Sequence, residues 1–257
     1  MKIQEIRNAT IIVTYKGKKL LIDPWFKKKG TGLTAPCPDK TYRQPSPLVE
    51  LPLPAEQVVR GIDAVIVTHI HPDHFDSYSA EFLNKELPVF VQGEKDKKKI
   101  EKMGFSSVRV LSDAGTSFEG ITLTRTKGRH GTSCLRNGGK VCGVLFSASG
   151  EKKLYVAGDT VWYKGIEEEL KKHRPDVIVL NACGAELSGI GRLIMHKEDV
   201  AEVCAAAPYA KVVASHMEAV NHGTVSRKGL KDYLEKRGYI KQVLIPEDGE
   251  EYEFKLH

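Results

Sequence analysis

Residues 65–74 read VIVTHIHPDH, so three histidines and one aspartate fall within six positions directly after an apolar run. The run from Ile62 to Thr68 is typical of a buried strand, and Pro72 favours a turn of the backbone just beyond it. Such a turn lets the three imidazoles converge. Desolvating them together costs free energy unless they bind something in return, so the spacing predicts a metal site. The alternative is a histidine-rich surface turn that binds no metal.

Three further polar side chains follow strand-like runs elsewhere in the chain. His130 ends the run ITLTRTKGRH, Asp159 follows LYVAG within a Gly-Asp-Thr turn, and His216 follows KVVAS. Each one alone is more typical of a turn, a helix cap or a satisfied structural group. Together with the histidine-rich stretch they place four ligand-type segments at strand ends, where a sheet scaffold presents a site.

The composition is that of an ordinary globular protein. The chain has 257 residues, 41% of them hydrophobic and 28% charged, with a formal net charge of +6. No stretch of about 18 uncharged apolar residues is present, which argues against a membrane partner. The basic runs at 27–29 and 95–102 lack interleaved aromatic residues, which argues against nucleic acid. A small molecule is the expected partner, with an anion as one option, and the sequence leaves the oligomeric state open.

The cysteines indicate a reducing environment. They stand at positions 37, 134, 142, 183 and 204, an odd number without any Cys-x-x-Cys pair. This pattern argues against a disulfide framework and against a thiolate zinc site. Glu5 and Arg7 interrupt the N-terminal stretch where a secretory signal needs apolar residues, so we expect a cytoplasmic protein.

The order of the expected elements predicts the fold class. Paired strands come first, a strand–helix alternation follows, a run of antiparallel strands comes next, and a second alternation ends the chain. Two β-rich halves flanked by helices imply a layered α/β sandwich, with residues 1–257 forming a single domain. Residues 27–54 interrupt the pattern with six prolines. A loop of this length is expected to be a lid or a pocket wall, the alternative being a surface insertion.

The motifs resemble the metallo-β-lactamase superfamily. The resemblance rests on His-x-His-x-Asp-His at 69–74, on His130, Asp159 and His216, and on Asp23, which is similar to the family's early aspartate. It covers residues 20 to 222 approximately. It implies a four-layer αββα sandwich with a dinuclear metal site in the cleft between the two sheets. Residues 189–198, GIGRLIMHKE, also resemble the cytosolic hydrolases that include the ascorbate-phosphate lactonases.

The resemblance also implies a role for each matching residue. One metal ion would be held by His69, His71 and His130, a second by Asp73, His74 and His216, and Asp159 would bridge the two. Zinc is the first expectation for such imidazole and carboxylate ligands, with manganese or iron as alternatives. His216, at the end of a strand-like run, is expected to be a ligand in preference to His222.

Departures from the family's pattern disfavour some of the functions found in the superfamily. His71 stands where the flavo-diiron oxidoreductases of the superfamily carry a carboxylate, which disfavours oxygen reduction. The large second domain of its nucleases has no counterpart here. The 27–54 segment matches nothing in the family, and we expect it to select the substrate.

The expected reaction is metal-dependent hydrolysis. Two divalent ions lower the pKa of a bound water from about 15.7 to about 7, which supplies a hydroxide at neutral pH. Asp73 is the expected catalytic residue, orienting that hydroxide, while His196 and His222 are expected to contact substrate or to donate a proton. The expected substrate is a small ester, lactone or phosphate-bearing metabolite. The alternatives are a mononuclear iron oxidoreductase similar to the sulfur dioxygenases, a nucleic-acid phosphodiesterase, and a non-catalytic anion-binding module.

Overall fold

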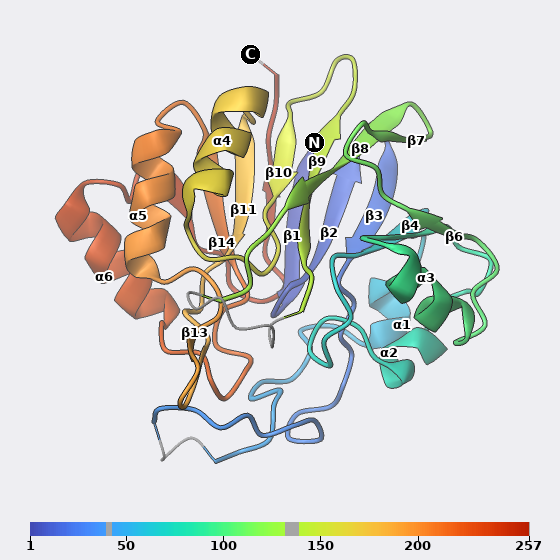
Figure 1. Ribbon diagram of the computed structural model, residues 1–257, viewed down its shortest axis with the longest axis horizontal. Coiled ribbons are helices and arrows are strands. Elements are labelled where there is room, and N and C mark those ends of the chain that lie inside the picture. Colours follow the sequence, from blue (N-terminus) through green and yellow to red (C-terminus); the bar gives the residue numbers. More distant parts are fainter. Residues whose placement is uncertain (40–42, 132–138, 257) are drawn as a thin grey trace.

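Two seven-stranded sheets lie face to face in the computed structural model, which describes residues 1–39, 43–131 and 139–256 (Figure 1). The first sheet contains, in spatial order, β16 (Glu251–Glu253), β1 (Lys2–Arg7), β2 (Thr10–Tyr15), β3 (Lys18–Ile22), β4 (Ala64–Val67), β5 (Val89–Val91) and β6 (Val108–Val110). Strands β16 to β3 pair antiparallel, whereas β3 to β6 pair parallel.

The second sheet has the same mixed character. It contains, in spatial order, β15 (Val243–Leu244), β14 (Lys211–Ser215), β11 (Val177–Asn181), β10 (Leu154–Val156), β9 (Cys142–Ser147), β8 (Ile121–Lys127) and β7 (Thr116–Phe118). Strands β15 to β10 pair parallel and β10 to β7 antiparallel. A separate short hairpin joins β12 (Glu186–Leu187) to β13 (Gly191–Arg192).

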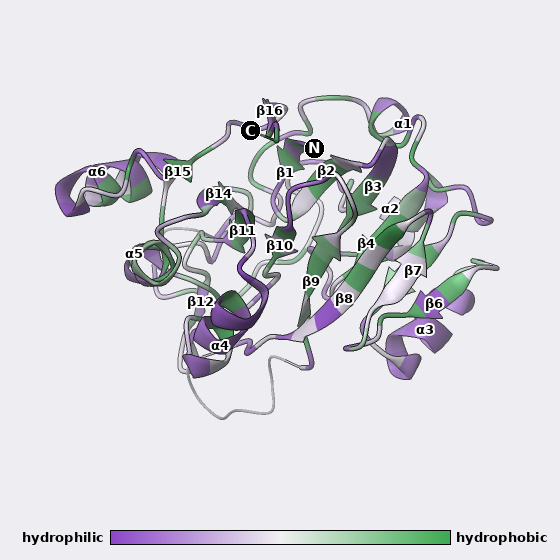
Figure 2. Ribbon diagram, turned by 90° about the horizontal axis from the view of Figure 1, so that it is seen from above, coloured by the Kyte–Doolittle hydropathy of each residue, from purple (hydrophilic) through white to green (hydrophobic). Residues whose placement is uncertain are grey.

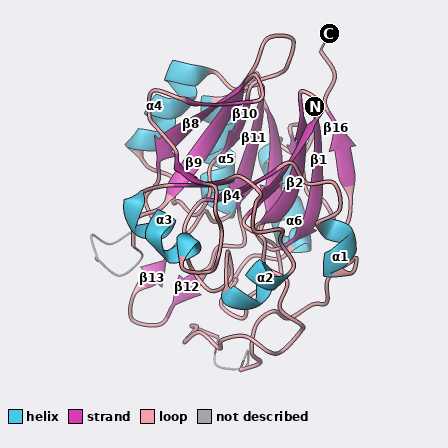
Figure 3. Ribbon diagram, turned by 90° about the vertical axis from the view of Figure 1, so that its right-hand side faces the viewer, coloured by secondary structure: helices cyan, strands magenta, loops and turns pink. Residues whose placement is uncertain are grey.

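Helices cover the outer face of each sheet, as Figures 1 and 3 show. The first sheet carries α1 (Ala55–Val58), α2 (Ser77–Glu81) and α3 (Glu94–Glu101), and the second carries α4 (Lys164–His173), α5 (Lys197–Ala206) and α6 (Arg227–Arg237). Apolar side chains form one cluster between the sheets and one beneath each helical layer. The predicted αββα sandwich is therefore confirmed.

The central strands are apolar on both faces because both faces are covered. All four residues of β4 and all five of β11 are buried. Figure 2 shows hydrophobic colour along the strands and hydrophilic colour along much of α3 and α6. Continuous apolar runs of this kind are what the parallel part of a doubly covered sheet requires. No helix within the described ranges is long and apolar enough to cross a membrane.

Two predicted elements end earlier than the sequence suggested. Residues 77–86, SYSAEFLNKE, have a sequence typical of one helix, but α2 stops at Glu81. Phe82 and Leu83 donate to carbonyls only three residues back, and Asn84 caps the next turn through its side chain. The strand expected to reach His130 ends at Lys127. Gly128 follows, where a Cβ would lie 2.9 Å from the side chain of Val141. His130 therefore sits on a loop beyond the strand.

Candidate metal centre

Strand ends bring the predicted ligands together. The loop after β4 carries residues 69–74, Asp159 follows β10, and His216 follows β14. His130 reaches the same place from the loop after β8. Among the described residues the donor atoms form three groups in which all donors lie within 4.8 Å of one another: a first with His69, His71 and His130, a second with Asp73, His74 and His216, and a third with Asp23, His69 and His74. The first and second groups are the two sets that the family resemblance implies.

Asp159 lies between the first and second groups. Its Oδ2 is 3.2 Å from Nε2 of His74 and 3.6 Å from Nε2 of His130. The same oxygen is 3.8 Å from Nε2 of His69, and Oδ1 is 3.9 Å from Nε2 of His216. Asn181 donates a hydrogen bond of 2.7 Å to Oδ1, which fixes the carboxylate. One carboxylate thus faces donors from both groups, the position that a bridging ligand requires.

Four of the imidazoles are held from behind through Nδ1. The partners are Thr68 Oγ1 for His69 at 3.1 Å, Asp23 Oδ2 for His74 at 2.9 Å, the Leu193 carbonyl for His130 at 3.0 Å, and Cys183 Sγ for His216 at 3.4 Å. Because Nδ1 is engaged, Nε2 is the ring nitrogen left to face Asp159. Such hydrogen bonds select the tautomer and the ring direction of metal-binding histidines.

The residues fit a metal ion by a second criterion. Nε2 of His74 and Nε2 of His216 are buried, and neither makes a hydrogen bond within residues 1–39, 43–131 and 139–256. Buried polar atoms in folded proteins are nearly always satisfied. Two orphaned imidazole nitrogens directed at carboxylates are accounted for by a cation that both would ligate.

The pKa directions agree with this reading. Burial lowers the pKa of His69 well below its ordinary value, and repulsion from His74 adds to the shift. At Asp159 burial opposes ionisation, but His74, His216 and His130 together outweigh it and hold the pKa well below the ordinary value. At His74 burial is outweighed by Asp159 and Asp23, which raise the pKa to about 10. The carboxylates therefore favour positive charge at this point, and a metal ion binding there would displace a proton.

Asp23, which sequence reasoning matched to the family without giving it a role, orients His74. Its carboxylate is buried and accepts hydrogen bonds from the Thr68 amide at 2.7 Å and the Thr68 hydroxyl at 2.6 Å, besides His74. With its oxygens so engaged, Asp23 fixes the ring of His74. The signal in the sequence that could have indicated this role is the position of Asp23 directly after the apolar run of β3.

Asn8 is a positioning residue that sequence reasoning missed. Its side-chain amide donates to the Asp73 carbonyl at 2.9 Å, and its own carbonyl accepts from the His216 amide at 2.8 Å. It therefore ties together the two loops that carry ligands of the second group. Asn8 has a φ of 60°, a conformation that asparagine tolerates better than most residues.

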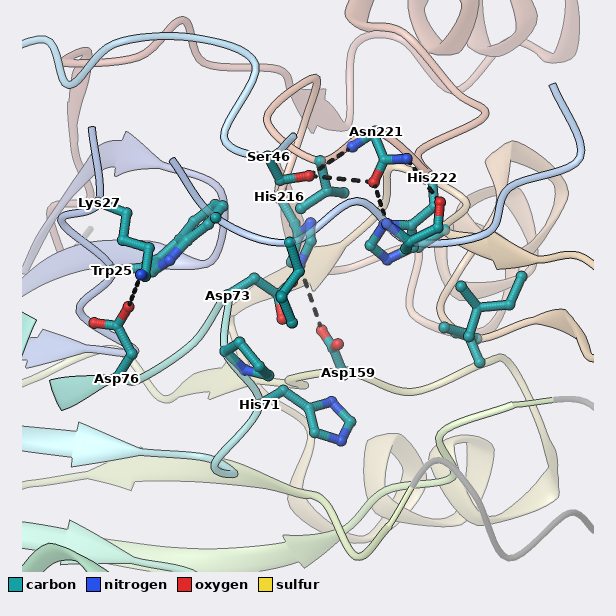
Figure 4. Close-up of a pocket in the computed structure, with 18 of the residues that line it drawn as sticks. Trp25, Lys27, Ser46, His71, Asp73, Asp76, Asp159, His216, Asn221 and His222 are labelled. Carbon is teal, nitrogen blue, oxygen red and sulfur yellow. Dashed lines mark hydrogen bonds and ion pairs between the residues drawn. The ribbon is translucent and has the colours of Figure 1, made fainter. Parts of the chain in front are cut away.

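A cavity of about 560 Å³ opens above the centre (Figure 4). Its polar wall includes His71, Asp73, Asp159 and His216, and its apolar wall includes Trp25, Leu33, Leu187, Ile190, Leu193 and Val220. Among its described lining residues Lys27 is the only lysine or arginine, and Nζ lies 3.7 Å from Asp76. This volume is typical of a small-molecule site.

The two remaining candidate histidines have different positions. His222 lines the cavity, and its buried Nδ1 makes no hydrogen bond within the described ranges. His196 is the N-cap residue of α5, pairs with Glu198 through Nδ1, and is not among the cavity-lining residues. The structure thus brings His222, and not His196, to the place where a substrate would bind.

The Pro-rich segment forms one wall of the cavity and is anchored at both ends. Arg7, fully buried, donates to the carbonyls of Trp25 and Lys27, each at 2.9 Å, and of Val49 at 3.1 Å. Its guanidinium also lies 5.2 Å from the centre of the Trp25 ring. Within the segment, both the amide and the carbonyl of Ala35 bond to the side chain of Asn221.

Comparison with known proteins places this architecture in a family. The model of the beta-lactamase superfamily domain matches residues 18–217. The chain belongs to the beta-lactamase superfamily. It is 49% identical over 258 residues to UPF0173 protein YddR of Bacillus subtilis (strain 168), covering 99% of this chain and 100% of that protein. It is also 26% identical to a UPF0173 metal-dependent hydrolase of Koribacter versatilis, over 70% of this chain and 71% of the relative.

Solved structures of superfamily members agree. The crystal structure of isothiocyanate hydrolase from Delia radicum gut bacteria is 37% identical, with a TM-score of 0.92 and coverage of 100% of both chains. That of a possible metal-dependent hydrolase from Veillonella parvula is 36% identical, with a TM-score of 0.92 and coverage of 98% of both. The UPF0173 chain described here is accordingly a metal-dependent hydrolase.

We expect Asp23→Asn to weaken metal binding about 10- to 100-fold, because an amide cannot accept from Thr68 and His74 together. Competition with a chromophoric chelator measures the affinity. Asp63→Asn is the matched control. Asp63 lies directly before β4 and accepts hydrogen bonds from the Lys18 side chain and the Lys19 amide of β3, away from the donor groups. Equal metal affinity for the Asp23 variant and the control would contradict the orienting role.

We expect Arg7→Met to lower the free energy of unfolding by about 2–4 kcal/mol, because three carbonyls lose their buried donor. Cleavage by a protease should then begin within residues 27–54. The exposed Arg60, changed to Met, is the control. Urea unfolding and mass spectrometry of the first fragments report both effects, and unchanged stability with no cleavage in the segment would refute the anchoring role.

Proposed function

We propose that this enzyme uses two divalent metal ions, zinc being the first expectation, to hydrolyse a small, uncharged and largely apolar substrate at an electrophilic carbon. The position of Asp159 between two groups of buried donors carries the proposal. One tetrahedral ion has too few coordination positions for all seven candidate ligands. The apolar wall of the cavity above this centre supports an uncharged and largely apolar substrate.

Each residue has a distinct role in this proposal. His69, His71 and His130 would hold one ion, Asp73, His74 and His216 the other, and Asp159 would bridge them. Bound there, the two ions would supply an activated water nucleophile at neutral pH and polarise the bond under attack. Asp73 borders the cavity with its side chain 22% exposed, so it can orient the attacking water.

Isothiocyanates are the first substrate class to test. A relative 37% identical over its full length is described as an isothiocyanate hydrolase. The central carbon of an N=C=S group is electrophilic and small enough to approach a buried centre. Addition of water forms a C–O bond and puts one proton on nitrogen. The remaining proton of the water then passes to nitrogen as the C–N bond breaks, which releases an amine and carbonyl sulfide. His222 would donate the proton to nitrogen, and this role is supported by its position at the cavity and by its Nδ1, which makes no hydrogen bond within the described ranges.

The other expected substrates fit the cavity unequally. Small esters and lactones share an electrophilic carbon and stay within the proposal. A phosphate-bearing metabolite has less support, because Lys27 is the only lysine or arginine among the described lining residues and it already faces Asp76. Membership of a hydrolase family favours hydrolysis over the iron oxidoreductase alternative. No feature of the described cavity favours a nucleic-acid strand.

We expect the zinc-loaded enzyme to release amine from an alkyl isothiocyanate at least tenfold faster than it cleaves a matched phosphomonoester. Release of amine, followed with an amine-reactive fluorophore, gives the rate. The metal-free protein is the control for spontaneous hydrolysis. Faster turnover of the phosphomonoester would overturn the proposed substrate class.

Asp159→Ala should lower the metal content and reduce turnover more than 100-fold, because a bridging carboxylate contacts both ions. Elemental analysis of the purified variant measures the metal directly. Glu198→Ala, at an acidic residue in the first turn of α5 that is absent from the described cavity wall, is the control. A variant at Asp159 with full metal content and full activity would refute the bridge.

A further inference from the structure

An exposed leucine stands at the mouth of the cavity. The large hydrophobic side chains that are exposed in the described ranges are Leu33 at 68%, Leu53 at 37%, Tyr209 at 41% and Leu256 at 56%. Leu33 is the most exposed of them, and it alone among them lines the cavity of the metal centre. Its exposure keeps apolar surface in water, a cost that is recovered when an apolar ligand covers it.

The β12–β13 hairpin contributes more apolar surface to the same cavity. Leu187 and Ile190 lie at its tip and line the cavity with Leu33. Gly189 makes the turn with a φ of 75°. Figure 1 shows this hairpin and the 27–54 segment at the same end of the molecule, and Figure 3 shows them so from another side.

Backbone hydrogen bonds hold in place the two parts of the cavity rim, which are the β12–β13 hairpin and the stretch around Leu33. The Ser188 amide of the hairpin donates to the Pro36 carbonyl at 2.9 Å. The Ser46 amide donates to the Leu33 carbonyl at 3.0 Å, and the Gly32 amide donates to the Ser46 carbonyl at 2.7 Å. A Cβ on Gly32 would lie 2.4 Å from that carbonyl oxygen, so this close approach requires glycine. The apolar rim is therefore already ordered before a ligand arrives, which lowers the entropic cost of binding.

Apolar surface continues from the rim to the metal centre. Trp25 and Leu193 line the cavity and are 2% and 9% exposed. Leu193 also holds His130 through its carbonyl. A ligand whose head reaches the centre thus lies along apolar side chains over the rest of its length.

We propose that Leu33, Leu187 and Ile190 form a subsite that binds the apolar tail of the substrate and sets its preferred length. The inference deepens the proposed function, because it rests on a substrate with an electrophilic head and an apolar tail. Each methylene of the tail that leaves water against these side chains strengthens binding. The enzyme should therefore bind substrates with a hexyl substituent more tightly than substrates with a methyl substituent.

Calorimetry with straight-chain hydroxamates tests the subsite without turnover. The zinc-loaded enzyme is titrated with acetohydroxamate and with octanohydroxamate, which share a metal-binding head and differ in the tail. We expect octanohydroxamate to bind at least tenfold more tightly. In Leu33→Ser this advantage should fall about tenfold while acetohydroxamate binding stays unchanged, because only the long tail reaches the rim. Leu256→Ser, at an exposed leucine outside the described cavity wall, should keep the full advantage.

Kinetics on methyl and hexyl isothiocyanate give the second readout, with KM expected to rise in Leu33→Ser for the hexyl compound alone. A length advantage that survives in Leu33→Ser in both measurements would overturn the subsite. If the enzyme hydrolyses isothiocyanates with no dependence on tail length, the subsite fails and the proposed function stands. If it hydrolyses neither compound while Leu33→Ser still removes the hydroxamate advantage, the substrate class fails and the subsite stands.

Discussion

Five imidazoles and two carboxylates, each buried or half-buried, lie close together at one point of the molecule. This arrangement is the constraint on which the rest of the structure depends. Isolated burial of such groups is costly, and their pKa directions show the conflict: burial favours neutral histidines at His69, whereas Asp159 and Asp23 favour a charged His74. Divalent cations bound between the two groups of donors, as proposed, would resolve it, because imidazole and carboxylate both ligate them.

The sandwich supplies the rigidity that this arrangement needs. Strands such as β4 and β14 are covered on both faces and end at the cavity, so the candidate ligands that follow them in the sequence are attached to a rigid part of the backbone. Hydrogen bonds then complete the placement, from Asp23 to His74, from Asn181 to Asp159, and from Asn8 to the loops of Asp73 and His216. Arg7 and Asn221 attach the cavity wall made by the 27–54 segment to the same scaffold.

The fold class and the donor groups could be predicted from the sequence because their signals are local. Periodicity and the spacing of His69 to His74 need no knowledge of distant residues. Arg7 and Asn8 could not be predicted, because their partners are backbone atoms from 18 to more than 200 positions away. His196 and His222 looked alike in sequence. The structure separates them, since capping of α5 directs His196 to Glu198 while the loop after β14 brings His222 to the cavity.

The central claim is that two metal ions share the Asp159 carboxylate. A crystal structure of the zinc-loaded enzyme, with anomalous difference maps recorded on both sides of the zinc absorption edge, tests it most directly. The account predicts two zinc peaks about 3.5–4 Å apart with Asp159 between them, one peak beside His69, His71 and His130 and the other beside Asp73, His74 and His216. A single peak at full zinc loading, or two peaks that Asp159 does not join, would contradict it.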